Sequence, residues 1–460
     1  MTPPSAPAIT PSPSATYSAL ASRIKSNESV VGIIGLGYVG LPLAHTLHAG
    51  GCRLLGFDID PAKIVALKEG RNYLQHLGDG MVKDLSASSR FSATSDMSRL
   101  GECDVVIVCV PTPLGRHQEP DLTYVINSGI AIGKTLRKGQ LVILESTTYP
   151  RTTRDDFLPA ILAAAPASAK EIKVGEDLFV AFSPEREDPG RKTHTTRSTP
   201  KLVGGVDPHS TELAAMLYEK GVETVVRVSS AEVAEAAKLL ENIFRAVNIA
   251  MVNEMKIVLT AMGIDVWEVV RAASTKPFGF MPFYPGPGLG GHCIPIDPFY
   301  LTWKAREYGR PTRFIELAGE INTSMPHYVV DQLAHALNER GKPVKNAKVL
   351  IVGLAYKSDV DDTRESPSFE LIELLRERGA TVGYHDPYVP ESFPVRKHDL
   401  KMKSVELTKD NIAAYDVVLI STAHSTTDYA ALAKHSQLVV DTRDAMRKWT
   451  SEMGDRLVRA

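Results

Sequence analysis

Residues 285–298 read PGPGLGGHCIPIDP and place one cysteine among four glycines and four prolines. Regular helices and strands do not accommodate this much Gly and Pro, so we expect a loop. Cys293 has three readings: a small buried hydrophobe, a metal ligand together with His292 and Asp297, or a nucleophile. A metal site needs further ligands, and no second cluster in the sequence supplies them. We therefore predict no metal.

A second group of residues predicts a dinucleotide site. Gly35, Gly37 and Gly40 form GxGxxG between a strand pattern and a helix pattern, and Asp58 ends the next strand pattern. Such glycines allow a tight turn, close approach of a pyrophosphate and helix–strand packing, while the helix N-terminus favours anions. A carboxylate at the position of Asp58 binds ribose hydroxyls and disfavours a 2′-phosphate, which indicates NAD rather than NADP. Lys63 follows closely enough to offset part of that preference.

An NAD site gives the thiol of Cys293 a chemical use. A thiolate adds to an aldehyde, the adduct loses hydride to become a thioester, and water cleaves the thioester. Lys238 and Asn242 are four residues apart in a helix pattern, so they share a face where an oxyanion can be stabilised. Glu145 and Thr112 end strand patterns, where catalytic side chains sit in open α/β sheets. Three of these residues also have an ordinary interpretation. Lys238 could be a solvated lysine, Glu145 an acid at the start of a helix, and Thr112 a turn-forming residue.

Strand and helix patterns alternate along the chain and must position these residues. The segment 30–60 reads as strand, turn, helix and strand. Strand patterns open the segments 104–113, 140–148 and 178–188, and a helix pattern covers 231–264. A second strand–turn–helix–strand series follows at 346–356, 368–379 and 381–387, with later strand patterns at 416–424 and 437–446. The alternation predicts an α/β fold class with two Rossmann-like, doubly wound parallel-sheet domains joined by a long central helix and a helical middle domain. We expect these parts at 1–28 (a flexible tail), 29–228 (an NAD-binding domain), 229–330 (a central helical domain) and 331–460 (the second Rossmann-like domain).

Composition narrows the function classes. The 460 residues carry 52 Lys and Arg against 54 Asp and Glu, a net charge of -2, which gives no basis for binding nucleic acid or an anionic membrane. No apolar run reaches the roughly 20 residues that a membrane-spanning helix needs. The Pro- and Ser-rich N-terminus lacks the features of a secretory signal, so we expect a cytoplasmic protein.

The sequence resembles the UDP-glucose/GDP-mannose dehydrogenase family of nucleotide-sugar 6-dehydrogenases. The motifs that carry the resemblance span nearly the whole chain: GLGYVGLPLA (35–44), VPTP (110–113), ESTTYP (145–150), SPERE (183–187), AAKLLENIFRAVN (236–248), GGHCIPIDP (290–298) and GLAYKSDVDDTRESPS (353–368). The resemblance implies oxidation of a sugar C6 alcohol to a carboxylate with two NAD and one water. It also implies a C-terminal UDP-sugar-binding domain, a dimerisation role for the central domain, and a homodimer or higher homo-oligomer.

The resemblance also assigns roles to individual residues. It makes Cys293 the nucleophile, lets Lys238 and Asn242 stabilise the oxyanion with a water, and gives Glu145 the proton of the hydrolytic step. Asp297 tunes proton transfer near the thiol, and Thr112 positions a water. The implied cofactor contacts are Gly35, Gly37, Tyr38, Val39, Gly40, Asp58, Lys63, Thr112 and Arg364. The implied substrate contacts are Glu145, Lys238, Asn242, Tyr284, Gly288, Gly290, Lys357 and Arg443.

The stretch 275–305 decides the expected substrate. It resembles the bacterial UDP-N-acetylglucosamine 6-dehydrogenases of O-antigen and capsule pathways, as does SPEREDPG (183–190). The UDP-glucose enzymes carry a basic residue before the GG pair, where this chain has FYP, and Lys276 is a substitute cation. Three aromatic residues either line a pocket for an N-acetyl methyl group or pack in a core: Phe278, Phe280 and Phe283.

Several alternatives to a UDP-N-acetylhexosamine dehydrogenase stay open. One is a dehydrogenase of UDP-glucose or another UDP-hexose. A β-hydroxyacid dehydrogenase pairs GxGxxG with a helix Lys and Asn but performs one hydride transfer and needs neither Cys293 nor a third domain. A non-catalytic nucleotide-sugar sensor would not need Glu145, Lys238 or Cys293.

Overall fold

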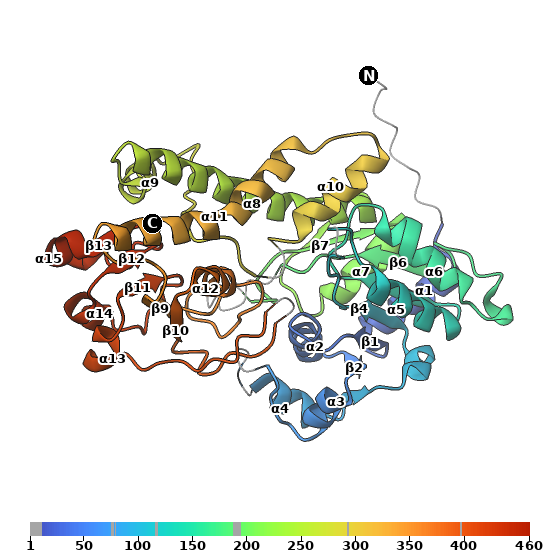
Figure 1. Cartoon of the computed structure of the whole chain (residues 1–460). Helices are drawn as coiled ribbons and strands as arrows, with labels where there is room; N and C mark the ends of the chain where they lie inside the picture. The colour runs from blue at the N-terminus through green and yellow to red at the C-terminus, as the bar shows by residue number, and fades with distance from the viewer. Residues whose placement is uncertain are drawn as a thin grey trace. The chain divides into compact units, whose positions relative to one another are not determined.

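The structure is a computed structural model that describes residues 12–74, 78, 80–115, 118–186, 195–291, 294–395 and 398–460 (Figure 1). His292 and Cys293 lie outside the described residues. The chain forms two compact units: Met1–Leu240 with Arg306–Tyr308, and Glu241–Ala305 with Gly309–Ala460. We describe each unit by itself.

The first unit contains one eight-stranded sheet. Its strands are β1 (Val30–Ile34), β2 (Arg53–Phe57), β3 (Phe91–Thr94), β4 (Val105–Val108), β5 (Gln140–Leu144), β6 (Leu178–Phe182), β7 (Lys201–Gly205) and β8 (Val225–Arg227). Their order is β3-β2-β1-β4-β5-β6-β7-β8. Strands β1 to β6 pair in parallel, which is the doubly wound arrangement, and β7 adds an antiparallel neighbour to β6.

Helices cover both faces of this sheet, which explains why β4, β5 and β6 are buried along their whole length. One core cluster joins the sheet to side chains of α1, α2, α4 and α7, and a second joins it to α5 and α6. The helices of the unit are α1 (Ala15–Lys25), α2 (Gly40–Ala49), α3 (Pro61–Lys68), α4 (Gly80–Ser86), η2 (Met97–Glu102), α5 (Thr123–Lys134), η3 (Thr152–Phe157), α6 (Leu158–Ala163), η4 (Ala167–Ala169) and α7 (Pro208–Tyr218).

Helix α1 departs from the expectation of a flexible tail over residues 1–28 at Ala15–Lys25, while residues 1–11 lie outside the described part of the chain. Ser14 caps the helix by accepting a hydrogen bond from the backbone N–H of Tyr17 at 3.0 Å. Leu20 and Ile24 are buried in the core of the first unit. The Pro- and Ser-rich composition obscured Leu20 and Ile24, which are one helical turn apart. Packing against α7 stabilises the helix that these two residues belong to.

The second unit contains an all-parallel, five-stranded sheet ordered β10-β9-β11-β12-β13. Its strands are β9 (Lys348–Val352), β10 (Thr381–His385), β11 (Val417–Ile420), β12 (Val439–Asp441) and β13 (Leu457–Arg459). Its helices are α9 (Val266–Ala273), α10 (Asp297–Glu307), α11 (Arg313–Asn338), α12 (Pro367–Glu377), α13 (Lys409–Ala413), α14 (Tyr429–His435), η5 (Arg447–Trp449), α15 (Thr450–Met453) and η6 (Gly454–Arg456). The predicted α/β class with two parallel sheets is confirmed.

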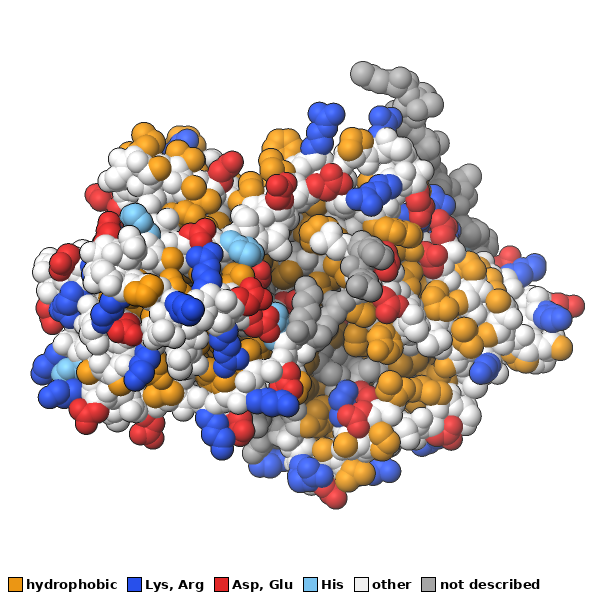
Figure 2. All heavy atoms as spheres, viewed as in Figure 1, with side chains coloured by type: hydrophobic (Ala, Val, Ile, Leu, Met, Phe, Trp, Pro, Cys, Tyr) orange, Lys and Arg blue, Asp and Glu red, His pale blue; other side chains and the backbone are white. Residues whose placement is uncertain are grey.

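The long helix α8 (Ala231–Ala261) begins in the first unit and continues in the second. The predicted helix at 231–264 is therefore present. Within the described part of the chain, no helix has both the length and the apolar character needed to cross a membrane. Basic and acidic side chains are intermingled on the face shown in Figure 2, in keeping with the near-zero net charge.

Candidate active site

The glycine turn between β1 and α2 has the geometry that a dinucleotide site requires. Gly35 has a φ of +91°, and an added Cβ there would lie 2.4 Å from the carbonyl oxygen of Cys109. An added Cβ at Gly40 would lie 1.8 Å from the carbonyl oxygen of Gly35, whereas one at Gly37 would meet nothing within 4 Å. Helix α2 starts beside this open space without a side-chain cap. The turn therefore fits a pyrophosphate that approaches the backbone at Gly37.

Asp58 fixes this turn from the end of β2. One carboxylate oxygen accepts the backbone N–H of Leu36 at 3.0 Å, and the other accepts that of Asp60 at 3.0 Å. Lys63 pairs with the same carboxylate at 3.0 Å. Because Lys63 is paired with Asp58, its ammonium is less able to attract the 2′-phosphate of NADP.

The ends of β4 and β5 are joined by side-chain hydrogen bonds. Thr112 donates from its hydroxyl to the carbonyl of Thr147 at 2.8 Å. The hydroxyl of Ser146 accepts the backbone N–H of Val110 at 2.9 Å and donates to the carbonyl of Val110 at 2.7 Å. These bonds bring the VPTP and ESTT segments together at the carboxyl edge of the sheet, where Glu145 also lies.

Glu145 belongs to a buried cluster of ionisable side chains. It is 1% exposed, and its Oε1 accepts hydrogen bonds from the Tyr218 hydroxyl and, at 2.9 Å, from the Lys201 ammonium. Lys201 also donates to the carbonyl of Pro184 at 3.3 Å and lies 5.1 Å from the centre of the Tyr218 ring. Among the residues that the structure describes, Oε2 of Glu145 has no hydrogen-bond partner. One oxygen is thus held by two donors, and the other is buried without a donor among these residues.

Burial controls the protonation of this cluster. It raises the pKa of Glu145 against the opposing effect of Lys201. Burial disfavours the charge on Lys201, but Glu145 and Glu185 outweigh it and raise the pKa of the ammonium. A carboxyl group with a raised pKa is a stronger base near neutral pH, which is what the hydrolysis of a thioester requires.

In the second unit, Asn242 and Asp297 meet directly. The amide of Asn242 donates to a carboxylate oxygen of Asp297 at 2.6 Å. Asp297 is buried at the first position of α10, four residues after Cys293 in sequence. Lys238 is buried on α8, one turn before Asn242. The predicted pairing of Lys238 and Asn242 on one helix face is therefore consistent with α8.

The glycine-rich loop is anchored to the helices of the second unit. The backbone N–H of Gly286 donates to the side chain of Asn253 on α8 at 3.0 Å, and Asn253 donates to Asn322 on α11 at 3.0 Å. An added Cβ at Gly286 would lie 2.4 Å from a guanidinium nitrogen of Arg443, and one at Gly290 would lie 2.5 Å from Cβ of Tyr356. These glycines give clearance to the chain's own side chains.

The other expected substrate contacts are placed as follows. Arg443 donates to the carbonyl of Ser421 at 2.8 Å, and burial lowers its pKa to about 10. Arg364 forms a two-pronged ion pair with Asp362, the shorter contact being 2.6 Å, and its carbonyl accepts the N–H of Gly291 at 3.2 Å. Lys357 is partly buried in the same loop as Arg364.

The aromatic residues of the loop lie mostly at the surface. Tyr284 is half exposed and stacks on Trp267. Phe278 and Phe280 are exposed, which does not fit packing in a core, and Lys276 lies over the ring of Phe278. Phe283 packs edge-on against Phe244.

The second Rossmann-like turn differs from the first in the partner of its acid. Gly353 repeats the φ of +91° seen at Gly35. Asp386, at the position that corresponds to Asp58, accepts the backbone N–H groups of Leu354 and Ala355 and pairs with buried His424 at 3.0 Å. Its carboxylate is therefore saturated inside the protein.

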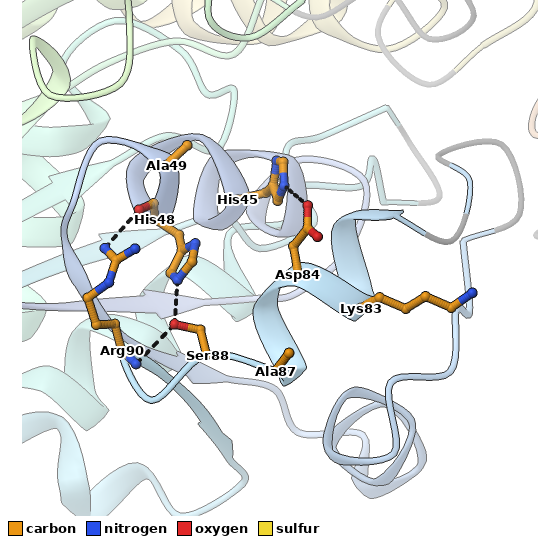
Figure 3. Close-up of a pocket in the computed structure, with 8 residues that line it drawn as sticks. All are labelled: His45, His48, Ala49, Lys83, Asp84, Ala87, Ser88 and Arg90. Carbon is orange, nitrogen blue, oxygen red and sulfur yellow. Dashed lines mark hydrogen bonds and ion pairs between the residues drawn. The ribbon is translucent and has the colours of Figure 1, made fainter.

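A hollow of about 800 Å³ on the first unit does not coincide with these residues (Figure 3). Its lining includes side chains of α2, α4 and the segment after α4 that form hydrogen bonds: His45 with Asp84 at 3.1 Å, and His48 with Ser88 at 2.7 Å. The guanidinium of Arg90 donates to the carbonyl of His48 at 2.9 Å. No group of His, Cys, Asp or Glu suited to a metal ion occurs among the described residues, here or elsewhere.

Several residues of these sites were missed from the sequence. Lys201 and Tyr218 lie 56 and 73 residues after Glu145, and their strand and helix patterns are apolar enough to conceal a polar partner. Asn253 was missed because an asparagine within a long helix resembles any solvated one. A signal for it existed: Asn242 and Asn253 are three helical turns apart and therefore share a face.

Comparisons with known proteins agree with this geometry. Three domain models of the UDP-glucose/GDP-mannose dehydrogenase family match: the NAD binding domain at residues 29–222, the central domain at 232–324 and the UDP binding domain at 350–448. The chain is 38% identical to UDP-N-acetyl-D-glucosamine 6-dehydrogenase of Pseudomonas aeruginosa, over 86% of this chain and 90% of that protein. It is 34% identical to UDP-N-acetyl-D-mannosamine dehydrogenase of Methanococcus maripaludis, over 77% and 79%.

A solved structure gives the same result for the fold. The UDP-D-ManNAc dehydrogenase of Pyrococcus horikoshii superposes with a TM-score of 0.80 at 30% identity, over 90% of this chain and 96% of that one. NAD as cofactor and a UDP-sugar-binding domain, both expected from the sequence, are confirmed by the matched domains. The chain belongs to the UDP-glucose/GDP-mannose dehydrogenase family and is an NAD-dependent UDP-sugar dehydrogenase by family.

Proposed function

We propose that this chain oxidises the C6 hydroxyl of a UDP-N-acetylhexosamine to the carboxylate, with UDP-N-acetylglucosamine as the first candidate. The observation that carries the substrate class is the 38% identity to the Pseudomonas aeruginosa enzyme over 86% of the chain. UDP-N-acetylmannosamine is the second candidate because relatives of that specificity are 34% identical. The two sugars differ only in configuration at C2. UDP-glucose or another UDP-hexose is the remaining alternative.

The residues of the second unit and of α8 act first. NAD, when bound, supplies the oxidation by accepting hydride. Lys238 and Asn242 lie on one face of α8 and stabilise the charge that develops on the C6 oxygen. Asp297, which accepts a hydrogen bond from Asn242, orients that amide and takes part in proton transfer beside the thiol. Cys293 then attacks the aldehyde carbon, and oxidation of the adduct leaves a thioester.

Glu145 acts last. Its Oε1 is held by Lys201 and Tyr218, so its Oε2 is the oxygen that removes a proton from the hydrolytic water. The hydroxide equivalent adds to the thioester carbon, the C–S bond breaks, and the carboxylate and the Cys293 thiol are the products. Thr112, fixed to the backbone of Thr147, positions a water near the sugar.

We infer the remaining contacts and the assembly in the same way. The turn at Gly35, Tyr38 and Val39, with Asp58 and Lys63, binds the cofactor, and Arg364 contributes to it. Tyr284, Gly288, Gly290, Lys357 and Arg443 bind the substrate. We also propose the division at 29–228, 229–330 and 331–460, and a homodimer or higher oligomer that forms through the central domain.

Counting NADH tests the proposal. The protein is incubated with limiting amounts of UDP-N-acetylglucosamine, UDP-N-acetylmannosamine or UDP-glucose, and NADH formed per sugar is measured together with the mass of the product. We expect two NADH per sugar and a uronate with one of the two N-acetylated sugars. One NADH per sugar would contradict the four-electron reaction, and preference for UDP-glucose would overturn the substrate class.

The variant Cys293→Ser tests the nucleophile. A hydroxyl forms an ester in place of a thioester, and the ester is cleaved far more slowly, so we expect uronate release to stall. Asp177→Asn, at a surface ion pair of the first unit, is a control for handling. Unchanged uronate production by Cys293→Ser would remove the assignment.

A further inference from the structure

A small cavity lies in the second unit where α8 ends. Its volume is about 210 Å³. It is lined by the end of α8, the turn into α9 and the last strand, namely Lys256, Thr260, Gly263, Ile264, Asp265, Val266, Trp267 and Arg459. Ligand sites for drug-sized molecules have volumes of about 300–1,000 Å³, so this cavity fits a small molecule and not a nucleotide sugar.

The cavity is distant from the oxyanion residues, although Arg443, one of the proposed substrate contacts, is a charged neighbour of Lys256. Asn242 and Lys256 are fourteen residues apart on the same helix. A rise of about 1.5 Å per residue puts them roughly 21 Å apart along the axis of α8. A ligand confined to the cavity therefore does not reach the oxyanion residues.

Lys256 is the unusual feature of the cavity wall. It is 2% exposed, and its ammonium has no hydrogen-bond partner among the residues that the structure describes. It lies over the ring of Tyr328 on α11, with 5.6 Å between the nitrogen and the ring centre. A buried ammonium without a partner is strongly unfavourable, so chains rarely keep one without a use for it.

The charged groups around Lys256 do not compensate it. Asp441 accepts the backbone N–H groups of Arg443 and Met446, each at 2.8 Å. Asp265 accepts hydrogen bonds from Arg459 and from the backbone of Trp267. Asp444 pairs with Arg271 at 2.6 Å and with Arg459 at 3.5 Å. Among these groups the four cations, Lys256, Arg271, Arg443 and Arg459, outnumber the three carboxylates of Asp265, Asp441 and Asp444 by one.

We propose that this cavity binds a small oxyanion, a carboxylate or a phosphate, through the ammonium of Lys256. An ammonium offers three N–H donors, and an oxyanion supplies both the missing acceptors and the missing negative charge. Ile264, Val266 and Trp267 form the apolar part of the cavity lining.

The protonation of Lys256 supports this role. Burial, and then repulsion by Arg443, lowers its pKa to about 7, while Asp441 acts in the opposite direction. Asp265, Arg459 and Tyr328 are the other ionisable groups that face it. An anion favours the charged amine, so binding is strongest below pH 7 and weakens as the pH rises above it.

Thermal unfolding of the full chain with added anion tests the proposal. Acetate is suited to the pH series because it stays ionised from about pH 6.5 to about pH 8.5. Sodium acetate replaces sodium chloride at constant ionic strength, and inorganic phosphate is titrated separately. We expect acetate or phosphate to raise the unfolding temperature, with an apparent affinity that falls on the order of tenfold between these pH values for acetate.

The matched variants are Lys256→Met and Lys434→Met, the second at an exposed lysine of α14. Methionine has nearly the same length and removes an uncompensated charge, so Lys256→Met should fold. It should lose the anion effect, and Lys434→Met should keep it. A stronger effect of phosphate than of acetate identifies a phosphate-type ligand, and the reverse identifies a carboxylate. No shift in the wild type, or the same shift in Lys256→Met, overturns the proposal.

A measurement on the wild type alone guards against a variant that misfolds. Acetic anhydride acetylates neutral amines, and mass spectrometry quantifies the product at each lysine. We expect the effective anion to slow acetylation of Lys256 several-fold relative to Lys434. Equal protection of both lysines would place the anion elsewhere and overturn the proposal.

Discussion

At the scale of single residues, the two carboxylate oxygens of Glu145 have different surroundings. Its Oε1 accepts hydrogen bonds from Lys201 and Tyr218, whereas its Oε2 is buried with no hydrogen-bond partner in the described part of the chain. Burial raises the pKa, and Lys201 limits the rise. The balance between these two effects sets the pH above which Glu145 is a base.

Replacing Lys201 should therefore move the pH dependence of hydrolysis. In Lys201→Met the pKa of Glu145 rises further because the cation is gone, so a smaller fraction is ionised near neutral pH. We expect kcat near pH 7 to fall about tenfold and the acidic limb of the kcat profile to move to higher pH. Tyr218→Phe should move it in the same direction by less. Lys173→Met, at a surface ion pair, is the control, and an unmoved limb in Lys201→Met would contradict this coupling.

A second prediction at this scale concerns Asp58 and the choice between NAD and NADP. In Asp58→Asn the ribose loses a charged acceptor and Lys63 is released to meet a 2′-phosphate. We expect kcat/KM with NAD to fall about tenfold and the preference for NAD over NADP to narrow, since hydrogen bonds to charged groups contribute about 1.5–3 kcal/mol. Steady-state kinetics with both cofactors measures this. Lys63→Met, in which Asp58 is kept, should preserve the preference for NAD.

At the scale of elements, the chain uses one strand–turn–helix device in two ways. The turn after β1 keeps an open space at Gly37, and helix α2 starts immediately beyond it. The turn after β9 shares the glycine conformation, but its acid, Asp386, is occupied by His424 and backbone N–H groups. The first turn therefore leaves space at the backbone for a dinucleotide, whereas the acid of the second turn is tied to a buried histidine.

The first turn supplies a matched pair of substitutions. Gly40→Ala puts a methyl group 1.8 Å from the carbonyl oxygen of Gly35, so we expect a loss of stability of roughly 3 kcal/mol or more. Gly37→Ala meets no atom within 4 Å and should leave stability unchanged while it weakens NAD binding. Urea unfolding and NAD titration separate the two effects. Equal stability of both variants would contradict the packing role of Gly40.

At the scale of the whole molecule, α8 carries surface that a monomer leaves in water. Leu240 is 67% exposed, and Phe244, Met251 and Val258 are also exposed. Its opposite side carries Lys238 and Asn253, which face inward. An exposed apolar stripe along a long helix favours burial against a second copy of the chain.

The assembly prediction follows from that surface. We expect Leu240→Glu to weaken self-association, because each copy of the interface would bury a charge without a partner. Sedimentation velocity should show a lower mass at a given concentration than for the wild type. Leu162→Glu changes an exposed leucine of α6 and should leave the mass unchanged. An unchanged mass for Leu240→Glu would place the interface elsewhere.

Much of the fold is readable from the sequence because the signals are local. Apolar runs with turn residues at their ends predicted β1, β4, β5, β6 and β9, and a long run of helical periodicity predicted α8. The GxGxxG turn was recognisable because the steric constraints that require its glycines act between residues close together in the sequence. Family motifs then identified the cofactor and the class of reaction.

Only the tertiary structure decided which side chains become partners. Lys201 and Tyr218 join Glu145, Asn253 anchors the loop at Gly286, and α1 packs into the core through Leu20. Lys256 is distinguished by the acceptor that it lacks. Each of these features depends on residues far apart in sequence and on burial, which changes the free energy of a charge. Neither can be read from a local pattern of residue types.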